Sequence, residues 1–138
     1  MDVGRWTLDF GLMIVSIGID IVEVYRIRET LARTPRFVER VFTTGERDYC
    51  DGRGAAAAQS FAARFAAKEA CLKALQTGWR GTITWQDIEI VSGENGVPRL
   101  EIRNEAQKIL ENLGANRVHL SMSHTNDHAI AQVILERD

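Results

Sequence analysis

The clearest pattern in the chain is a strict alternation of apolar and polar residues over positions 15–21. The apolar members are β-branched, and alternation with a period of two is typical of a β-strand. The polar face carries Gly18, where another group can approach closely, and it ends in the carboxylate of Asp20. The apolar face consists of Val15, Ile17, Ile19 and Ile21.

Helices are predicted to follow this strand. Residues 25–31 can form one, and Pro35 suits the first helical position of the next, because its fixed φ already matches the helix. Thr43, with Glu46 three residues later, fits a capping box at the start of a further short helix. A longer helix is predicted over 55–76.

The second half of the chain predicts hairpins rather than a strict alternation of strands and helices, so α+β is the better fold class. We expect a single compact domain over 13–138, in which a mostly antiparallel sheet packs against the long helix. Residues 1–12 are expected to form an N-terminal extension. The remaining expected elements are strands at 82–91, 97–102, 117–123 and 128–135 and a helix over 105–113 capped by Asn104.

The composition is that of a folded domain without disulfide staples. The 138 residues are 45% hydrophobic and 26% charged, and a chain of this length buries roughly two-thirds of its unfolded surface. Cys50 and Cys71 have no metal-ligand spacing, so we expect reduced thiols in a cytoplasmic protein. No stretch approaches the roughly 18 apolar residues of a membrane span, so we expect no membrane contact.

The charge pattern favours an acidic or phosphorylated partner. A net charge of −2 is too near neutral for a general nucleic-acid-binding protein. Residues 26–47 nevertheless hold six arginines and three glutamates, a local charge of +3. If this segment is helical, Arg36 and Arg40 lie one turn apart on an exposed edge, and together with Arg26 they are candidates for partner binding. The alternative is an ordinary solvated face.

The long helix carries the densest set of candidate site residues. Glu69 and Lys73 lie at i and i+4 on one edge, and the simplest interpretation is a solvated ion pair. Lys68 falls within the apolar stripe, and Arg64 lies one turn earlier. Since only three of the 17 basic residues are lysines, two of them in this helix also suggest phosphate binding, which a compact ammonium suits. The stripe expected to pack on the sheet consists of Phe61, Phe65, Leu72 and Leu75.

Asp20 and Glu69 form a candidate metal site if the first strand and the long helix pack together. Mg²⁺ typically takes one or two protein carboxylates, while water and substrate phosphate complete its shell. Asp20 alone is more simply explained as a strand-end carboxylate that caps the following turn. His124, followed by Thr125, is either a turn residue or part of a phosphate-binding pair.

The segments that contain these residues resemble the small holo-[acyl-carrier-protein] synthases, a family of 4′-phosphopantetheinyl transferases. The motifs are GIDIVEVYRI at 18–27, FAARFAAKEACLKAL at 61–75 and SMSHT at 121–125, and they lie in the family's order. The likeness extends roughly from Met13 to the C-terminus. GxD alone is a weak signal, whereas GxD, KEAxxK and SHT at these separations are specific together.

The resemblance implies an enzyme that transfers the 4′-phosphopantetheine arm of coenzyme A to a serine of apo acyl carrier protein, supporting fatty acid biosynthesis. The other product is adenosine 3′,5′-bisphosphate. By that likeness Asp20 and Glu69 bind Mg²⁺, and Glu69 takes the serine proton, directly or through a metal-bound water. Lys73 would neutralise charge on the leaving phosphate. The residues implied to hold coenzyme A are Arg53, Arg64, Lys68, Lys73, His124 and Thr125.

The resemblance further implies a homotrimer with its sites between subunits. Two alternatives of a different class remain open at this stage. One is a module that binds coenzyme A or a carrier protein without catalysis, and the joint presence of Asp20, Glu69 and Lys73 argues against it. The other is an unspecialised α+β interaction domain that uses its arginine-rich segment.

Overall fold

The computed structural model describes residues 11–77 and 82–138, so the expected extension over residues 1–12 lies almost entirely outside the described residues. The first strand begins at Met13, where the domain was predicted to start. The elements are β1 (Met13–Glu23), α2 (Val24–Arg33), α3 (Pro35–Val41), α4 (Thr44–Asp51), η1 (Gly54–Ala56), α5 (Ala57–Leu75), η2 (Trp85–Asp87), β2 (Ile88–Ser92), η3 (Glu94–Gly96), β3 (Pro98–Ile102), α6 (Asn104–Asn112), β4 (Arg117–His124) and β5 (His128–Arg137).

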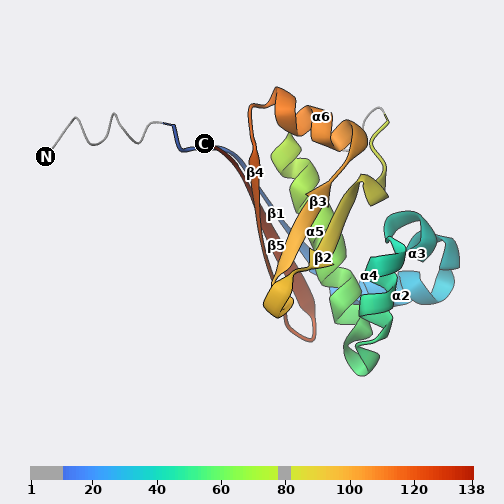
Figure 1. Ribbon diagram of the computed structural model, residues 1–138. Coiled ribbons are helices and arrows are strands. Elements are labelled where there is room, and N and C mark those ends of the chain that lie inside the picture. The colour runs from blue at the N-terminus through green and yellow to red at the C-terminus, as the bar shows by residue number, and fades with distance from the viewer. Residues whose placement is uncertain (1–10, 78–81) are drawn as a thin grey trace, which may run out of the picture.

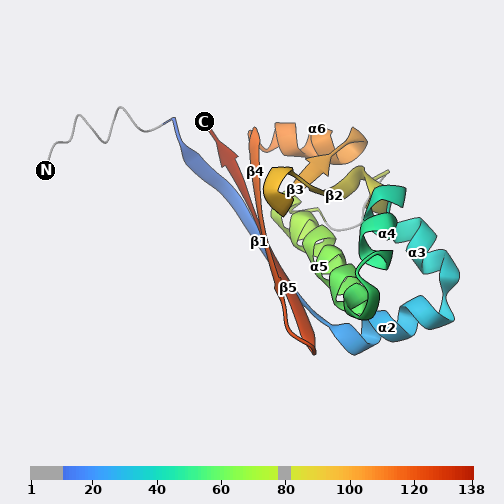
Figure 2. The same ribbon diagram turned by 60° about the horizontal axis from the view of Figure 1, so that its bottom comes forward.

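Helix α5 lies at the centre of the fold, and every other layer packs around it (Figures 1 and 2). Strands β1, β5 and β4 form an antiparallel sheet in that order along one side of α5. Strands β2 and β3 form a separate antiparallel hairpin, and α2, α3 and α4 cover the N-terminal half of α5. The α+β class is therefore confirmed, with two sheets where one was expected.

The contact between β1 and α5 depends on Gly18. A Cβ atom at Gly18 would lie 1.9 Å from the carbonyl oxygen of Ala70 and 2.7 Å from the backbone nitrogen of Ala74, far inside van der Waals contact. The close approach predicted for this glycine is therefore the contact with α5, and the helix meets β1 through alanines. The prediction that Phe61 and Phe65 pack on the sheet is incomplete, because both rings also lie in an aromatic cluster with Phe37, Phe42 and Trp85, in a core that reaches the sheet at Ala129.

The isoleucine face of β1 points away from the core. The polar face with Gly18 lies against α5, so the alternation places Ile17, Ile19 and Ile21 on the outer surface, where they are 53%, 52% and 63% exposed. Ile130 of the neighbouring strand β5 is also exposed. Exposed apolar residues gathered on one sheet face are typical of an interaction surface.

Two predicted boundaries are wrong for local reasons. The strand expected at 82–91 begins only at Ile88, because Thr84 and Asp87 form a capping box that closes a 3₁₀ turn between them. Asn104 does not cap α6 with its side chain; it adopts a positive φ of 54° and donates to Asp87 Oδ1 instead. The Thr43–Glu46 capping box of α4 is confirmed.

Both cysteines are free and buried in the core. Burial raises the pKa of the Cys50 thiol and of the Cys71 thiol to about 12, so both stay protonated at neutral pH. Neither therefore has the thiolate character that a nucleophile or a metal ligand needs. Of the helices described, none has the length and apolar character that crossing a bilayer requires.

Candidate active site

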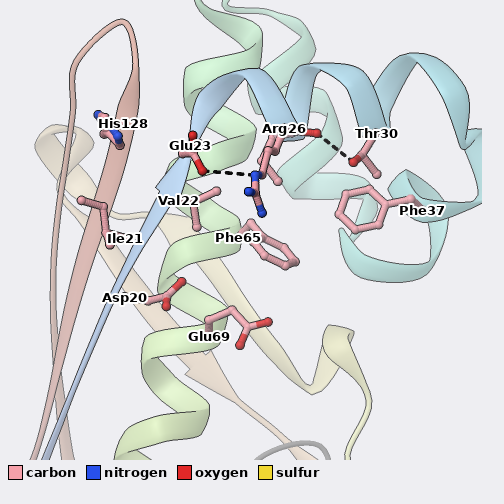
Figure 3. Close-up of a pocket in the computed structure, with 11 residues that line it drawn as sticks. Asp20, Ile21, Val22, Glu23, Arg26, Thr30, Phe37, Phe65, Glu69 and His128 are labelled. Carbon is pink, nitrogen blue, oxygen red and sulfur yellow. Dashed lines mark hydrogen bonds and ion pairs between the residues drawn. The ribbon is translucent and has the colours of Figure 1, made fainter.

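A cavity of about 590 Å³ lies between β1, α2, α3 and α5 (Figure 3). Its wall is apolar where Phe37 and Phe65 face it and acidic where Asp20 and Glu69 face it. Arg26 stands at its rim in an ion pair with Glu23 at 3.1 Å. The other residues that line it are Ile21, Val22, Ile27, Thr30 and His128.

The structure brings together Asp20, Glu69 and Lys73. Asp20 and Glu69 line the same cavity from β1 and α5, as the metal-site prediction required. The Lys73 Nζ atom lies 3.0 Å from Asp20 Oδ1 and 3.0 Å from the carbonyl oxygen of Ile19. The Lys73 side chain is 56% exposed, so its ammonium remains available to an anion that enters beside Asp20.

Neighbouring residues in α5 fix the place of Glu69. Ala70, on one side of it in the chain, packs directly on Gly18 of β1. Lys68, on the other side, is fully buried and held by a buried ion pair. Because adjacent helix residues point about 100° apart, these two contacts leave the Glu69 side chain facing the cavity between β1 and α3.

Lys68 does not reach the surface, which corrects its expected contact with coenzyme A. Its Nζ atom lies 2.9 Å from Glu46 Oε1 and donates to the carbonyl oxygens of Trp85 and Ile88. An ammonium has three donors, so none is left for a ligand. Burial lowers the pKa of the Lys68 ammonium, and the charge of Glu46 opposes that shift. Lys68 therefore has a structural role.

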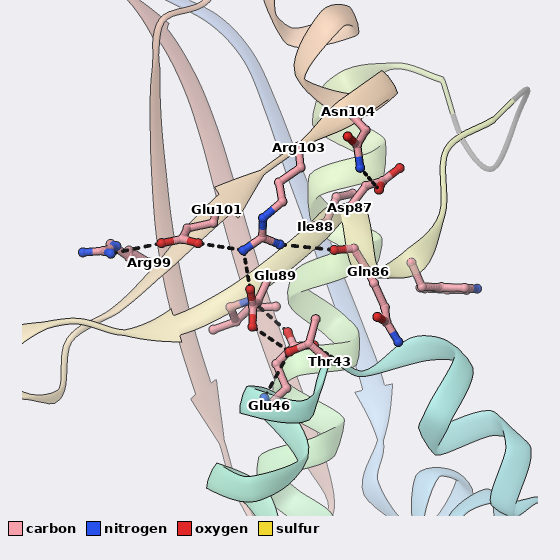
Figure 4. A network of polar contacts seen from close by, with 12 residues as sticks. Thr43, Glu46, Gln86, Asp87, Ile88, Glu89, Arg99, Glu101, Arg103 and Asn104 are labelled. Carbon is pink, nitrogen blue, oxygen red and sulfur yellow. Dashed lines mark hydrogen bonds and ion pairs between the residues drawn. The ribbon is translucent and has the colours of Figure 1, made fainter.

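Glu46 connects this ion pair to a polar network that reaches the surface (Figure 4). Its carboxylate also accepts from the backbone nitrogens of Thr43 at 2.9 Å and Ile90 at 2.8 Å. The Thr43 hydroxyl donates to Glu89, which Arg103 holds from its other side. Burial opposes ionisation of Glu89, but the bonds from Thr43 and Arg103 outweigh it, so its pKa lies below the ordinary value. The network ties α4, α5, β2 and β3 together.

A second cavity, of about 130 Å³, gathers three of the residues expected to hold coenzyme A. Arg53, Arg64 and His124 all line it, together with Tyr49 of α4 and Ser60 of α5. It shares no lining residue with the first cavity. Arg64 and Ser60 lie on a different face of α5 from Phe65 and Glu69, so the two cavities lie on different sides of the helix.

The remaining predicted residues lie at the surface. Thr125 shapes the β4–β5 turn, since its hydroxyl accepts from the backbone nitrogens of Asp127 at 3.2 Å and His128 at 3.1 Å. Arg36 and Arg40 are exposed on α3, one turn apart as expected. The roles predicted for these residues stay predictions. Two features were not predicted from the sequence: Tyr49 at the second cavity, and the ion pair through which Glu46 holds Lys68 next to Glu69 in α5.

Asp20 and Glu69 suit Mg²⁺ better than they suit a metal ion whose ligands all come from the protein. Among residues 11–77 and 82–138, no group of three or more His, Cys, Asp or Glu side chains is arranged to hold a metal ion. Asp20 and Glu69 are two hard oxygen ligands in one open cavity, which matches a Mg²⁺ site completed by water and substrate phosphate. The residues present therefore fit this ion.

Known proteins match nearly the whole chain. A family model described as the 4′-phosphopantetheinyl transferase superfamily matches residues 16–133. The holo-[acyl-carrier-protein] synthase of Koribacter versatilis is 47% identical over 125 residues, which are 90% of this chain and 99% of that protein. The corresponding protein of Geobacillus kaustophilus is 47% identical over 126 residues, 91% of either chain.

Solved structures agree. The holo-(acyl-carrier-protein) synthase of Bacillus anthracis, in complex with CoA (3′,5′-ADP), has a TM-score of 0.75 at 40% identity and covers 91% of this chain and 99% of its own. The synthase of Neisseria meningitidis has a TM-score of 0.79 at 37% identity and covers 91% of this chain and 100% of its own. The chain belongs to the 4′-phosphopantetheinyl transferase superfamily, among the holo-[acyl-carrier-protein] synthases.

Proposed function

We propose that this enzyme transfers the 4′-phosphopantetheine arm of coenzyme A to a serine of apo acyl carrier protein, with Mg²⁺, and so serves fatty acid biosynthesis in the cytoplasm. The observation that carries the proposal is that Asp20 and Glu69 line one cavity while Lys73 is ion-paired to Asp20 beside it. The solved complexes of similar synthases with coenzyme A, such as that from Helicobacter pylori at 32% identity and a TM-score of 0.74, support the choice of donor.

In the proposed reaction the serine oxygen bonds to the phosphorus that carries the pantetheine arm. The bond from that phosphorus to the oxygen of adenosine 3′,5′-bisphosphate breaks, and Glu69 accepts the serine proton. Lys73 lies beside Asp20 on the same wall, where its ammonium can neutralise charge on the leaving phosphate. Mg²⁺ held by Asp20 and Glu69 would supply Lewis-acid polarisation of the pyrophosphate.

We also propose a homotrimer whose sites form between subunits. The exposed isoleucines of β1 offer an apolar surface for a second copy. The two cavities carry complementary parts of one site, since the carboxylates lie in one and Arg53, Arg64 and His124 lie in the other. In the trimer, the first cavity of one subunit would lie against the second cavity of its neighbour. The two sets of residues, which lie apart in a single chain, would then form one site.

The direct test combines the protein with coenzyme A, an apo acyl carrier protein and Mg²⁺, and follows the intact mass of the carrier. We expect one phosphopantetheine per carrier on the reactive serine, and no modification when a chelator removes the metal or when that serine is replaced by alanine. An unchanged carrier mass, despite binding of coenzyme A, would favour a non-catalytic binding module.

Lys73→Ala is expected to lower kcat about a hundredfold, because a preorganised cation is most useful where charge develops in the transition state. KM for coenzyme A should change much less. Steady-state kinetics with saturating carrier measure both constants. Lys108→Ala removes a lysine from an exposed pair on α6 and is the matched control. Weaker binding with an unchanged kcat would make Lys73 a ground-state anchor.

Ile17→Glu is expected to convert the trimer to monomers, because it places a charge on the exposed isoleucine face. Activity should fall with the assembly, since the two cavities of neighbouring subunits can then no longer meet. Light scattering after size exclusion measures the mass, and Val97→Glu, at a 62% exposed position on the β2–β3 turn, is the control. A fully active wild-type monomer would contradict the shared site.

Arg26→Glu, Arg36→Glu and Arg40→Glu are each expected to raise KM for the carrier about three- to tenfold at low salt and to flatten its salt dependence. The reason is that acyl carrier proteins are acidic, and exposed charges act on encounter over a Debye length of about 8 Å at physiological ionic strength. KM for coenzyme A should barely move. Carrier kinetics across a salt series test this, and an unchanged salt slope would place the docking surface elsewhere.

A further inference from the structure

Two guanidinium groups lie over the ring of Tyr49. The Arg64 Cζ atom lies 4.0 Å from the ring centroid, and the Arg53 Cζ atom lies 5.7 Å from it. Both distances fall within the range of cation–π attraction, which extends to about 6 Å. Tyr49 lies on α4, Arg53 follows that helix and Arg64 lies on α5, so the ring joins three parts of the second cavity.

Among residues 11–77 and 82–138, no carboxylate pairs with Arg64. Its side chain is buried, with the residue only 4% exposed, and its Nε atom has no hydrogen-bond partner within that part of the chain. In the described part of the chain, neither Arg64 nor Arg53 forms an ion pair. Glu46, the nearest buried carboxylate along α4, is already occupied by Lys68 and two backbone nitrogens. A buried cation without a carboxylate partner calls for an anion.

The size and lining of the cavity indicate which kind of anion binds there. Its volume of about 130 Å³ suits a single phosphate group rather than a whole nucleotide. Guanidinium groups bind phosphate oxygens through two parallel hydrogen bonds, and the hydroxyl of Ser60 and the imidazole of His124 add polar groups at the same wall.

We propose that Tyr49 is a positioning residue for a phosphate-binding subsite: its ring holds the guanidinium groups of Arg53 and Arg64 at the cavity, where they bind one phosphate of coenzyme A. This inference rests on the proposed function for the identity of the ligand. Tyr49 acts through the two arginines and takes no part in the chemical step. Its loss therefore weakens binding of the nucleotide and leaves kcat nearly unchanged.

Tyr49→Leu and Tyr49→Phe separate the ring from its hydroxyl. Because Tyr49 is 39% exposed, both variants should fold, and thermal unfolding checks this. Calorimetric titration with adenosine 3′,5′-bisphosphate should show a dissociation constant about tenfold weaker for Tyr49→Leu and close to wild type for Tyr49→Phe. At saturating coenzyme A, kcat of Tyr49→Leu should stay within about twofold of wild type, while its KM rises.

A double-mutant cycle tests the coupling that the inference requires. Arg64→Gln should weaken nucleotide binding less in the Tyr49→Leu background than in wild type, because the leucine variant no longer positions the guanidinium. Additive effects would overturn the proposal, as would equal loss in Tyr49→Phe and Tyr49→Leu. Titration with inorganic phosphate shows whether a free anion suffices or the nucleotide is needed.

Failure of the proposed function gives a different result. In one outcome the wild-type protein binds inorganic phosphate more tightly than Tyr49→Leu does, yet binds neither coenzyme A nor adenosine 3′,5′-bisphosphate. That result would support the phosphate subsite and refute the coenzyme A assignment. If the wild-type protein and Tyr49→Leu bind the nucleotide equally well, the proposed function stands and the role of Tyr49 is refuted. Binding of none of these ligands would refute both.

Discussion

Asp20→Asn and Glu69→Gln are each expected to lower phosphopantetheine transfer by about a thousandfold or more, with the fold intact. Both substitutions preserve shape but remove a charge from the wall of one cavity, where two carboxylates suit a hard cation. Loss of either one removes several kcal/mol of stabilisation from the transition state of phosphoryl transfer. Asp20→Asn also releases Lys73 from its ion pair, so its effect combines two causes.

The measurement is turnover by intact carrier mass over a wide range of Mg²⁺ concentrations, with the thermal midpoint of each variant. Glu23→Gln is the matched control, because this carboxylate lines the same cavity but is held by Arg26 at its rim. Its kcat should remain close to wild type. Near-normal turnover of Asp20→Asn or Glu69→Gln at limiting Mg²⁺ would remove the metal assignment. Equal loss in Glu23→Gln would show that the effect follows the total charge of this wall and is not specific to Asp20 and Glu69.

The part of the site that could be predicted from sequence is the part with local signals. Asp20 follows Gly18 on the polar face of an alternating strand, although that strand continues to Glu23 rather than ending at Asp20 as expected. Glu69 and Lys73 share a helix edge at i and i+4. The alternating pattern of β1 also located the strand correctly. It could not say which face meets the helix, because a period of two fixes only that the faces differ. Gly18 decides it, since only a residue without Cβ permits the contact with Ala70.

The apolar pattern of the long helix did not predict the packing of its phenylalanines, for a related reason. A close approach between sheet and helix selects small side chains, so the face of α5 toward β1 is lined by alanines, and Phe61 and Phe65 pack in the aromatic cluster. The place of Lys68 in the apolar stripe did not predict that its ammonium is buried. A lysine in an apolar stripe usually extends its charge to water, and only the fold places the buried carboxylate of Glu46 from α4 against it. The separation of the predicted site residues into two cavities likewise depends on the tertiary structure.

Lys68→Met is expected to lower the free energy of unfolding by about 3–5 kcal/mol, because it leaves Glu46 as a buried, unpaired charge. Urea denaturation, with the midpoint and slope measured together, gives this value. Lys73→Met is the matched control on the same helix. Its ion pair with Asp20 has a similar length, 3.0 Å against 2.9 Å, but the Lys73 side chain is 56% exposed and that of Lys68 is fully buried. The control should therefore cost about 1 kcal/mol or less.

The double variant Lys68→Met/Glu46→Gln distinguishes a lost ion pair from a lost cation alone. Glutamine carries no charge and can accept from only one of the backbone nitrogens of Thr43 and Ile90, a loss that the single variant Glu46→Gln shares. The double variant should therefore be more stable than the sum of the single effects predicts, by about 2 kcal/mol. Strict additivity would mean that Lys68 stabilises the fold through the carbonyls of Trp85 and Ile88 rather than through Glu46. If Lys68→Met instead costs no more than Lys73→Met, the buried ion pair does not hold α5, and the position of Glu69 depends on the Gly18 contact alone.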